Sequence, residues 1–486
     1  GIRSKYRMRV LGFSEGFHDA AVAVIHNEGV LFAGHSERYS KIKNDKRICQ
    51  ELKQHARRYT TGLRTPDIAF YERHLIKRTR QIWAGQWKDA LRPRRLSYRY
   101  DHCFPHHLSH AAAAFQCSPF TDAVALIVDA IGEWDTVSSW RCSYDEDGNA
   151  EYTKLDSIRY PTSLGLFYSA VTDRIGLKPM EEEYITMGMA AFGKSNRKLY
   201  DALKMMLSRS NLHRGMRREL LEEIKEDIAY NAQALTEGVL KGFIKKLTKD
   251  GLPIVYGGGV ALNSVANGKL FKMKEHYIFP NPGDAGSALG AAALVTRKQL
   301  KLNHMFHGYQ LPLLSVSKIK EVVDILETGE AVGIAAGKAE FGPRALGNRS
   351  LLCDPRTSEN KDKVNEIKKR QLYRPFAPSI LKEHVRTYYK ITSKCDYSYM
   401  QYVVPTKTND FIATQHVDKS ARVHTVSNDL NEVSSLRHIL ECWYDRTGCP
   451  TLLNTSLNIR GKPMVNDQKD AIEFENEYGV KVFCNG

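Results

Sequence analysis

Short apolar strands that end in polar or glycine-rich loops recur along the first 290 residues and constrain the fold most. Residues 8–13 and 20–25 are rich in β-branched side chains and predict two strands separated by the polar turn 14–19. A third predicted strand, 123–129, ends at Asp129, and residues 253–263 pass from a strand through three glycines towards a helix. Strands that lead into helices in this way indicate an α/β fold with its functional residues along one edge of a sheet.

Helical periodicity fills much of the remaining chain. Charged and apolar residues alternate at a spacing of three to four across 195–250, and 285–300 predicts a further helix. The next stretch has no clear period and contains a proline, so we expect a domain boundary near residue 310. The expected domains are therefore 8–310 and 311–486, and the second opens with a helix at 315–327 and a strand at 331–336. No internal repeat is visible in the sequence.

The charge of the chain is unevenly distributed. Its 71 Lys and Arg against 55 Asp and Glu give a net charge of +16, and residues 41–100 alone contribute +12. Seven aromatic residues lie in the same segment: Tyr59, Phe70, Tyr71, Trp83, Trp87, Tyr98 and Tyr100. Basic and aromatic side chains together favour a surface that follows a nucleic-acid backbone and stacks on bases. A solvated basic helix pair, or a field that steers nucleotides, would have the same composition.

Other features of the composition bear on the cellular compartment. No apolar run approaches the roughly 18 residues that a membrane-spanning helix needs, and the N-terminal apolar stretch is too short for a signal peptide. The nine cysteines are an odd number and contain no CxxC pair, which argues against a disulfide framework or a zinc knuckle. We therefore expect a cytoplasmic protein without a membrane partner.

Two histidines predict a metal site. His106 and His110 lie four residues apart in an alanine-rich stretch, so a helix would place both imidazoles on one face, whereas His107 would point elsewhere. A carboxylate from Asp129 or Asp284 would complete a mixed nitrogen and oxygen site suited to iron, manganese or zinc. One packed and one solvated histidine explain the spacing equally well, and Asp284 has the alternative role of a helix N-cap.

Glycine and arginine motifs indicate phosphate binding. The three glycines at 257–259 expose backbone N–H groups to a close approach by phosphate, although they match neither Walker nor Rossmann spacing and a tight turn would also need them. In the C-terminal part, basic residues recur in the segments 341–350, 365–379 and 421–426, followed by the hydroxyl- and amide-rich segment 452–458. Guanidinium forks match phosphate oxygens, although any one such arginine is more typical of a solvated surface.

These segments, taken in order, resemble the NodU/CmcH carbamoyltransferase family nearly from end to end. The shared motifs are GFHDAAVAV, SERYSKIKND, HHLSHAAAAF, VDAIGEWDT, GGGVALN, PGDAGSALGAA, EFGPRALGNRS, YRPFAPSIL and LLNTSLNIRGKP. The resemblance implies an N-terminal domain of the actin-like ATPase superfamily and a C-terminal YrdC-like domain. It also implies that the second domain makes carbamoyladenylate from carbamoyl phosphate and ATP with Mg²⁺, and that the first passes the carbamoyl group to a hydroxyl.

The resemblance also implies roles for individual residues. The metal ligands would be His106, His110, Asp129 and Asp284, with Fe²⁺ as the first expectation and Mn²⁺ or Zn²⁺ as alternatives. His18 would be the catalytic histidine. The adenylate would be held by Gly257, Gly258, Gly259 and Asn263. Carbamoyl phosphate and ATP would be bound by Arg344, Arg349, Lys368, Arg374, Arg422 and Ser456.

The basic segment 41–100 leads to a prediction for the acceptor. A nucleic acid would bring a primary hydroxyl as a 5-hydroxymethylpyrimidine, such as hydroxymethylcytosine in DNA, and a duplex base would have to be flipped out at a cost of a few kcal/mol. The alternative is O-carbamoylation of a small-molecule or oligosaccharide natural product. A third possibility is a nucleic-acid-binding protein that has lost the chemistry, against which the intact histidine and arginine motifs argue.

Overall fold

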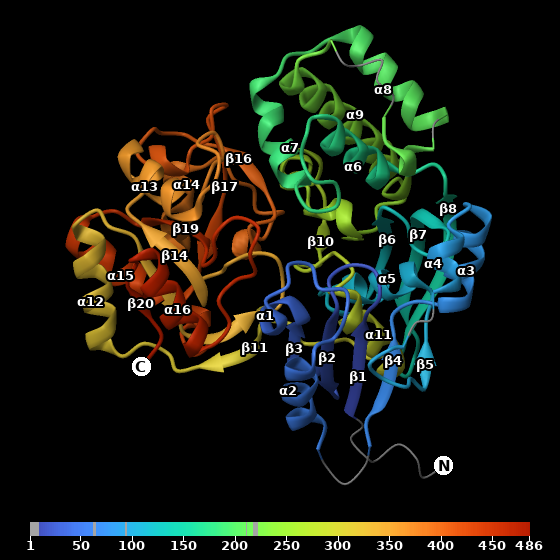
Figure 1. The fold of residues 1–486 in the computed structure, drawn as a ribbon, viewed down its shortest axis with the longest axis horizontal. Coiled ribbons are helices and arrows are strands. Elements are labelled where there is room, and N and C mark those ends of the chain that lie inside the picture. Colours follow the sequence, from blue (N-terminus) through green and yellow to red (C-terminus); the bar gives the residue numbers. More distant parts are fainter. Residues whose placement is uncertain (1–8, 62–64, 93–94, 210, 217–221) are drawn as a thin grey trace. The chain divides into compact units, whose positions relative to one another are not determined.

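A computed structural model describes residues 9–61, 65–92, 95–209, 211–216 and 222–486, and it confirms the α/β class. The chain forms two compact units (Figure 1). The first comprises the chain up to Ser36, Asn44–Asn263 and Lys274–Asn303; the second comprises Glu37–Lys43, Ser264–Met273 and His304–Gly486. The main break therefore lies between Asn303 and His304. Two short segments that we assigned to domain 8–310 belong to the second unit.

The first sheet of the first unit has the strand order β3-β2-β1-β4-β5. Its strands are β1 (Arg9–Ser14), β2 (Ala21–His26), β3 (Gly29–His35), β4 (Asp67–Phe70) and β5 (His102–Cys103). The first three strands pair antiparallel, and β4 and β5 continue the sheet from β1 in parallel. The predicted strands 8–13 and 20–25 are confirmed to within a residue at each end, and the polar turn between them carries His18.

The second sheet repeats this order as β8-β7-β6-β9-β10. Its strands are β6 (Asp122–Val128), β7 (Asp135–Tyr144), β8 (Ala150–Arg159), β9 (Ile254–Gly257) and β10 (His276–Ile278). Again the first three strands are antiparallel, and β9 and β10 extend the sheet from β6 in parallel. The first unit therefore contains two sheets of one topology, in line with the predicted actin-like ATPase domain. The sequence showed no repeat, but the structure contains one.

A helix follows the last strand of each sheet, and these two helices pack closely together. They are α5 (His106–Gln116) and α11 (Ser287–Thr296). A side chain at Gly290 of α11 would overlap the backbone carbonyl of Ser109 in α5, and one at Gly12 of β1 would overlap the carbonyl of Ala288. Glycine at these two positions lets the backbones approach, which places the N-terminal ends of both helices near the ends of β6 and β9.

The other helices of the first unit are α2 (Gln50–Thr60), α3 (His74–Trp83), α4 (Trp87–Leu91), α6 (Leu164–Arg174), α7 (Glu183–Met189), α8 (Arg197–Arg209) and α9 (Lys225–Leu247). Of these helices, α2 packs on the first sheet, whereas α6 to α9 form a group of their own (Figure 1). The helical content that we predicted across 195–250 is confirmed by α8 and α9, and the helix predicted at 285–300 corresponds to α11.

The second unit is built around a mixed six-stranded sheet of order β18-β15-β19-β14-β12-β20. These strands are β12 (Val332–Ala335), β14 (Arg349–Cys353), β15 (Ala377–Leu381), β18 (His424–Val426), β19 (Thr451–Ser456) and β20 (Val482–Phe483). Two small sheets pair β11 (Phe306–Leu311) with β13 (Gly337–Glu340), and β16 (Val403–Pro405) with β17 (Ser420–Arg422). The helices are α1 (Ser36–Ser40), which begins at the last residue of the first unit, α10 (Ser264–Leu270), α12 (Val316–Glu327), α13 (Ser358–Lys368), α14 (Val385–Tyr388), α15 (Leu436–Thr447) and α16 (Gln468–Tyr478).

The core of this unit is formed by apolar residues from its early and late parts in the sequence, among them Leu351, Val364, Leu453 and Phe474. The predicted helix 315–327 and strand 331–336 are confirmed by α12 and β12. The YrdC-like assignment of this unit stays a prediction. Within the described part of the chain, no helix is long and apolar enough to cross a membrane.

Candidate metal centre and phosphate site

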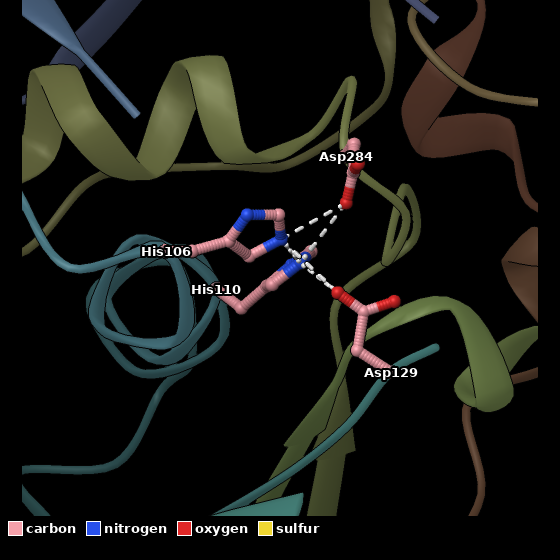
Figure 2. Close-up of side chains that lie close together, drawn as sticks. All are labelled: His106, His110, Asp129 and Asp284. Carbon is pink, nitrogen blue, oxygen red and sulfur yellow. Dashed lines mark hydrogen bonds and ion pairs between the residues drawn. The ribbon is translucent and has the colours of Figure 1, made fainter. Parts of the chain in front are cut away.

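Four side chains of the first unit, three of them buried and that of Asp284 partly buried, converge on one point (Figure 2). His106 and His110 project from one face of α5, Asp129 follows the end of β6, and Asp284 lies in the loop that precedes α11. One ligand atom from each residue lies within 4.8 Å of every other. The N-cap of α11 is Gly286, so Asp284 does not cap that helix but faces the imidazoles instead.

The distances between these atoms fit a metal coordination sphere. His106 Nε2 lies 3.1 Å from His110 Nε2, 3.0 Å from Asp129 Oδ2 and 3.1 Å from Asp284 Oδ1. His110 Nε2 lies 3.3 and 3.4 Å from the same two oxygens. Ligand atoms about 2.1 Å from one ion lie about 3.0 Å apart at right angles and about 3.4 Å apart in a tetrahedron. The donor set and its spacing therefore fit a divalent transition metal.

Hydrogen bonds from the outer ring nitrogens fix the orientation of both imidazoles. His106 Nδ1 donates to Glu72 Oε2 at 3.3 Å, and His110 Nδ1 lies 3.0 Å from the hydroxyl of Ser287. A partner on Nδ1 holds each ring with its Nε2 turned to the common centre, which is the usual outer support of metal-binding histidines. His107 faces Ser138 instead, as its place on the helix predicts.

A buried lysine neutralises Glu72. Lys77 of α3 lies 2.9 Å from both carboxylate oxygens, and the two side chains are 4% and 0% exposed. Burial raises the pKa of Glu72, but the charge of Lys77 and the bond to His106 outweigh it and lower the pKa to about 2. Glu72 is therefore ionised and can accept the proton of His106.

The electrostatics of the four-residue cluster favour bound positive charge. Burial opposes the charged form of His106, but the charge of Asp284 and bonds to both aspartates raise its pKa well above the ordinary value. The pKa of His110 is also raised, and burial is outweighed there by bonds to the same aspartates. Burial raises the pKa of each aspartate, yet bonds to and charges on the two histidines lower both. A buried pair of carboxylates needs such cations beside it.

His18 lies in the polar turn between β1 and β2 and is bonded at both ring nitrogens. Nδ1 lies 2.7 Å from Asp19 Oδ2, and Nε2 lies 2.9 Å from the carbonyl oxygen of Met180. Burial lowers its pKa, but the bond to and charge of Asp19, with the charge of Asp284, raise it to about 9. Since both partners are acceptors, both nitrogens donate, and the ring is an imidazolium in this arrangement.

The glycine motif lies at the end of β9, beside Asp129. Gly258 has a φ of +90°, and a side chain there would overlap the carbonyl of Val128 at the end of β6. A tight turn therefore accounts for Gly258, and a Cβ on Gly259 would lie 3.6 Å from Asp129 Oδ1. Asn263 forms two amide hydrogen bonds with Gln233, each 3.0 Å long. Adenylate binding by Gly257, Gly258, Gly259 and Asn263 stays a prediction.

In the second unit, Lys368 lies at the end of α13 against the end of β19. Its Nζ donates to the backbone and side-chain oxygens of Ser456 at 2.6 and 3.1 Å and to those of Asn458 at 3.0 and 2.9 Å. Burial, with the charges of Arg370, Arg374 and Lys43, lowers the pKa of Lys368 well below its ordinary value. Four oxygens thus hold this buried amine in place, and the charges of three nearby cations act on it.

Arg422 lies at the end of β17 among other arginines. Burial lowers its pKa well below the ordinary range, and the charges that add most to this effect are those of Arg344, Arg370 and Arg374. Its Nε is buried and has no hydrogen-bond partner in the described part of the chain. Repulsion of this kind indicates a site for a polyanion, because a bound phosphate would relieve it. The structure therefore groups three of the predicted arginines.

Arg349 is placed differently from the other predicted phosphate ligands. Its side chain is fully buried, and the guanidinium donates to five backbone carbonyls, those of Asn466, Ala336, Gly337, Asn348 and Tyr309. Burial lowers its pKa to about 10. Arg349 therefore ties the start of β14 to the start of β13, to β11 and to the segment before α16.

Glu340 fixes the loop that carries Arg344. Its Oε1 accepts three backbone N–H groups, from Leu346 at 2.9 Å, Asn348 at 3.0 Å and Arg349 at 3.2 Å. Arg38 from segment 37–43 lies 4.0 Å from its other oxygen and donates to the Gly342 carbonyl at 3.3 Å. This buried carboxylate therefore sets the conformation of the loop between β13 and β14.

Comparison with known proteins identifies the family of this chain. Residues 76–293 match a model described as carbamoyltransferase N-terminus, and residues 323–485 match one described as carbamoyltransferase C-terminus. Nodulation protein NolO of Bradyrhizobium diazoefficiens is 31% identical over 76% of this chain and 75% of its own length. The chain belongs to the carbamoyltransferase family.

One further sequence relative and one solved structure are similar to this carbamoyltransferase to different extents. The 3'-hydroxymethylcephem-O-carbamoyltransferase of Amycolatopsis lactamdurans is 25% identical over 97% of both chains. Among solved structures, T. kodakarensis HypF matches 61% of this chain and 48% of its own with a TM-score of 0.36 and 13% identity.

The structure also locates the aromatic residues of the basic segment 41–100, apart from residues 62–64 and 93–94, which lie outside the described ranges. Phe70 and Tyr71 are buried, and Tyr59 and Tyr98 pack against core phenylalanines. Tyr100 stacks on Phe70 and is partly exposed. Only the two tryptophans of α3 and α4 are more than half exposed. A continuous base-stacking surface is therefore not present among the described residues.

Sequence reasoning missed several residues of this carbamoyltransferase that support the sites. Glu72 and Ser287 contact the histidines of the candidate metal centre, and Lys77 pairs with Glu72. Asp19 raises the pKa of His18, and Arg370 adds to the cations around Arg422. One signal for Glu72 was its position directly after a buried strand. Nothing in the sequence showed that Lys77 turns inward.

Proposed function

We propose that this carbamoyltransferase is ATP-dependent: the second unit activates carbamoyl phosphate as carbamoyladenylate, and the first unit transfers the carbamoyl group to an acceptor hydroxyl. The observation that carries the proposal is the cation cluster of Arg422, Arg344, Arg370 and Arg374, with Lys368 held by Ser456. Two phosphate-bearing substrates would supply the negative charge that this cluster needs. Arg349 would position the β13–β14 loop rather than bind phosphate.

Activation would take place in two steps. Water splits carbamoyl phosphate into carbamate and inorganic phosphate. A carbamate oxygen then attacks the α-phosphorus of ATP and expels pyrophosphate, which leaves the mixed anhydride carbamoyladenylate. The arginines neutralise the charge that develops on the phosphate oxygens, and the intermediate has to be kept from water because AMP is a good leaving group.

The transfer step takes place in the first unit. The acceptor oxygen attacks the carbamoyl carbon, AMP leaves, and the hydroxyl proton passes to a base. Of the expected ions, Fe²⁺, Mn²⁺ and Zn²⁺ all suit the His106, His110, Asp129 and Asp284 set, and a bound ion would supply a Lewis acid. The N–H groups of the Gly258 turn lie beside Asp129 and would bind the adenylate phosphate.

His18 is the proposed base. In the described arrangement it is an imidazolium, so it can accept a proton only after losing one and after Nε2 leaves the Met180 carbonyl. The Nε2 proton would pass to solvent water, and an acceptor hydroxyl that takes the place of the Met180 carbonyl would then give its own proton to the neutral Nε2. Asp19, on the opposite nitrogen, would then stabilise the imidazolium that forms.

For the acceptor, we propose a hydroxyl on a small-molecule or oligosaccharide natural product. The relative named 3'-hydroxymethylcephem-O-carbamoyltransferase supports this class. Two of the seven aromatics in segment 41–100 are buried and two more pack against core phenylalanines, which weakens the case for hydroxymethylcytosine in DNA; that acceptor remains an outcome of the acceptor test.

Activation is tested by pyrophosphate release from ATP in the presence of carbamoyl phosphate. We expect Arg422→Ala to abolish release, because charge-assisted bonds to phosphate contribute about 1.5–3 kcal/mol each. Arg446→Ala is the matched control, since this arginine of the same unit forms surface ion pairs with Asp324 and Glu327. Normal release by Arg422→Ala would refute the assignment.

Transfer is tested separately. His110→Ala should lose bound metal and carbamoyl transfer yet still release pyrophosphate, whereas His18→Ala should lose transfer alone. Full transfer by metal-free protein would eliminate the metal role. The two acceptors are compared by mass spectrometry. A hydroxymethylcephem and hydroxymethylcytosine DNA are each incubated with the enzyme, ATP and carbamoyl phosphate. A carbamoylated nucleoside without a carbamoylated small molecule would overturn our choice.

A further inference from the structure

Helix α3 exposes its apolar side and buries its polar side. Lys77, Arg80 and Gln81 are buried, whereas Leu75 is 73% and Trp83 63% exposed. A surface helix of a globular protein normally has the opposite orientation, with its apolar stripe against the core. The outward face of α3 therefore has the composition of a surface that something covers.

Ion pairing and ring contacts hold α3 in this rotation. Lys77 is bonded to Glu72, and the guanidinium of Arg80 lies over the ring of Tyr160 at 5.5 Å and donates to Gln86 Oε1 at 3.5 Å. Turning the helix to bury Leu75 would break the buried ion pair, at a cost of several kcal/mol. The exposed apolar face is thus built into the unit.

Helix α4 extends this face. Trp87 and Leu91 lie one turn apart and are 56% and 71% exposed, while Ala90 is buried. We call the exposed side chains of Leu75, Ile76, Ile82, Trp83, Trp87 and Leu91 the α3–α4 face. Six large apolar side chains are thus exposed within residues 75–91, whereas elsewhere in the described chain no separate stretch of that length exposes more than two.

Exposed basic residues lie beside the α3–α4 face in the sequence. Lys88, Arg92 and Arg95 are exposed next to it. Asp89 is the one acidic residue between positions 73 and 100. The rim of the face is therefore cationic, and a partner that covers it must be apolar where it meets the six side chains and anionic around them.

We propose that the α3–α4 face docks this carbamoyltransferase onto an anionic lipid surface. Leucine and isoleucine side chains would enter the boundary between headgroups and acyl chains, the tryptophan rings would lie at headgroup depth, and the basic side chains would contact lipid phosphates. The sequence predicted no membrane partner because it contains no apolar run long enough to span a bilayer. A docking face has a different signature, in which a few exposed apolar residues stand among cations.

Two other partners fit these side chains less well. Nucleic acid would gain from the tryptophans and arginines, but four of the six side chains are aliphatic and have no base to stack on. A second copy in a two-fold interface would bring the cationic rims of both copies together, which is repulsive. The proposal does not depend on the carbamoyl chemistry, because the face contains no residue of either candidate site.

The test is co-sedimentation of the full chain with vesicles of phosphatidylcholine alone and of phosphatidylcholine with phosphatidylglycerol. We expect binding to the anionic vesicles, weakened by salt, with a blue shift of tryptophan emission. Leu75→Ser with Leu91→Ser should lower the partition coefficient at least about tenfold, because each leucine removed from lipid forfeits apolar burial. Arg92→Glu with Arg95→Glu should remove the preference for anionic vesicles.

The matched control is Val316→Ser, since this valine of α12 is 72% exposed but lies in the other unit. All variants should release pyrophosphate at the rate of the unchanged protein, which shows that they are folded. No binding to anionic vesicles, or equal binding by Leu75→Ser with Leu91→Ser, would overturn the proposal. The proposal would also be overturned if neither the unchanged protein nor the double variant bound vesicles, and the double variant lost an ability to bind DNA or to form dimers that the unchanged protein has.

Discussion

The ion pair of Glu72 and Lys77 allows its effect on stability to be separated from its effect on metal binding. Lys77→Met leaves the buried carboxylate with His106 alone, and removing one partner of a buried pair costs about 3–5 kcal/mol. Glu72→Leu with Lys77→Met removes both charges, so the free energy of unfolding should return to within about 1–2 kcal/mol of the original value.

Metal affinity should not recover in that double variant. His106 Nδ1 then has no acceptor from position 72, and loss of such an outer partner typically weakens metal binding about 10–100-fold. Glu72→Gln with Lys77→Met is the matched control, because the amide oxygen can still accept from Nδ1. Urea unfolding of metal-free protein and competition with a chelator measure the two quantities. If Glu72→Leu with Lys77→Met bound metal as tightly as the unchanged protein, Glu72 would have no orienting role.

Three further predictions concern charge. The pKa of His18 is about 9 in the fold and 6.5 ordinarily, so the protonated ring stabilises the fold fully below pH 6.5, and this contribution is lost as the pH rises through 9. Asp19→Asn should lower the pKa of His18, which NMR titration of the imidazole would show. Glu340→Gln should lower the free energy of unfolding of the second unit by about 1–3 kcal/mol and slow pyrophosphate release, because three N–H groups lose a charged acceptor. Binding of a divalent ion should release protons from the His106 and His110 pair, whose pKa values the aspartates raise, and calorimetry in buffers of different ionisation enthalpy would measure the release. Release of no proton would contradict the raised pKa values.

The sequence predicted those features that depend on local patterns. Strands 8–13, 20–25 and 123–129 were found because β-branched runs are local, and the HxxxH spacing placed His106 and His110 on one helix face. The two aspartates could be proposed because each lies directly after a strand or before a helix, where side chains of an α/β fold gather.

Features that depend on tertiary packing could not be predicted in this way. The repeated sheet order depends on which strands pair, and the two halves share it without a visible sequence repeat. Arg349 and Arg422 have the same side chain, but the fold gives one of them five backbone carbonyls and the other three neighbouring cations. Likewise, the charge of segment 41–100 did not reveal that Lys77 and Arg80 are buried or that most of its aromatics are packed.

The charges around the metal site favour a divalent ion over a trivalent one. Asp19, Glu72, Asp129 and Asp284 contribute four negative charges, and Lys77 and His18 contribute two positive ones. Protonation of His106 and His110 would bring the sum to zero without a metal. A divalent ion with two neutral imidazoles also brings it to zero, so the ion can replace two protons in this buried region without leaving uncompensated charge. A trivalent ion would leave one positive charge in excess, and it would bind tightly only if the site took up a further anion.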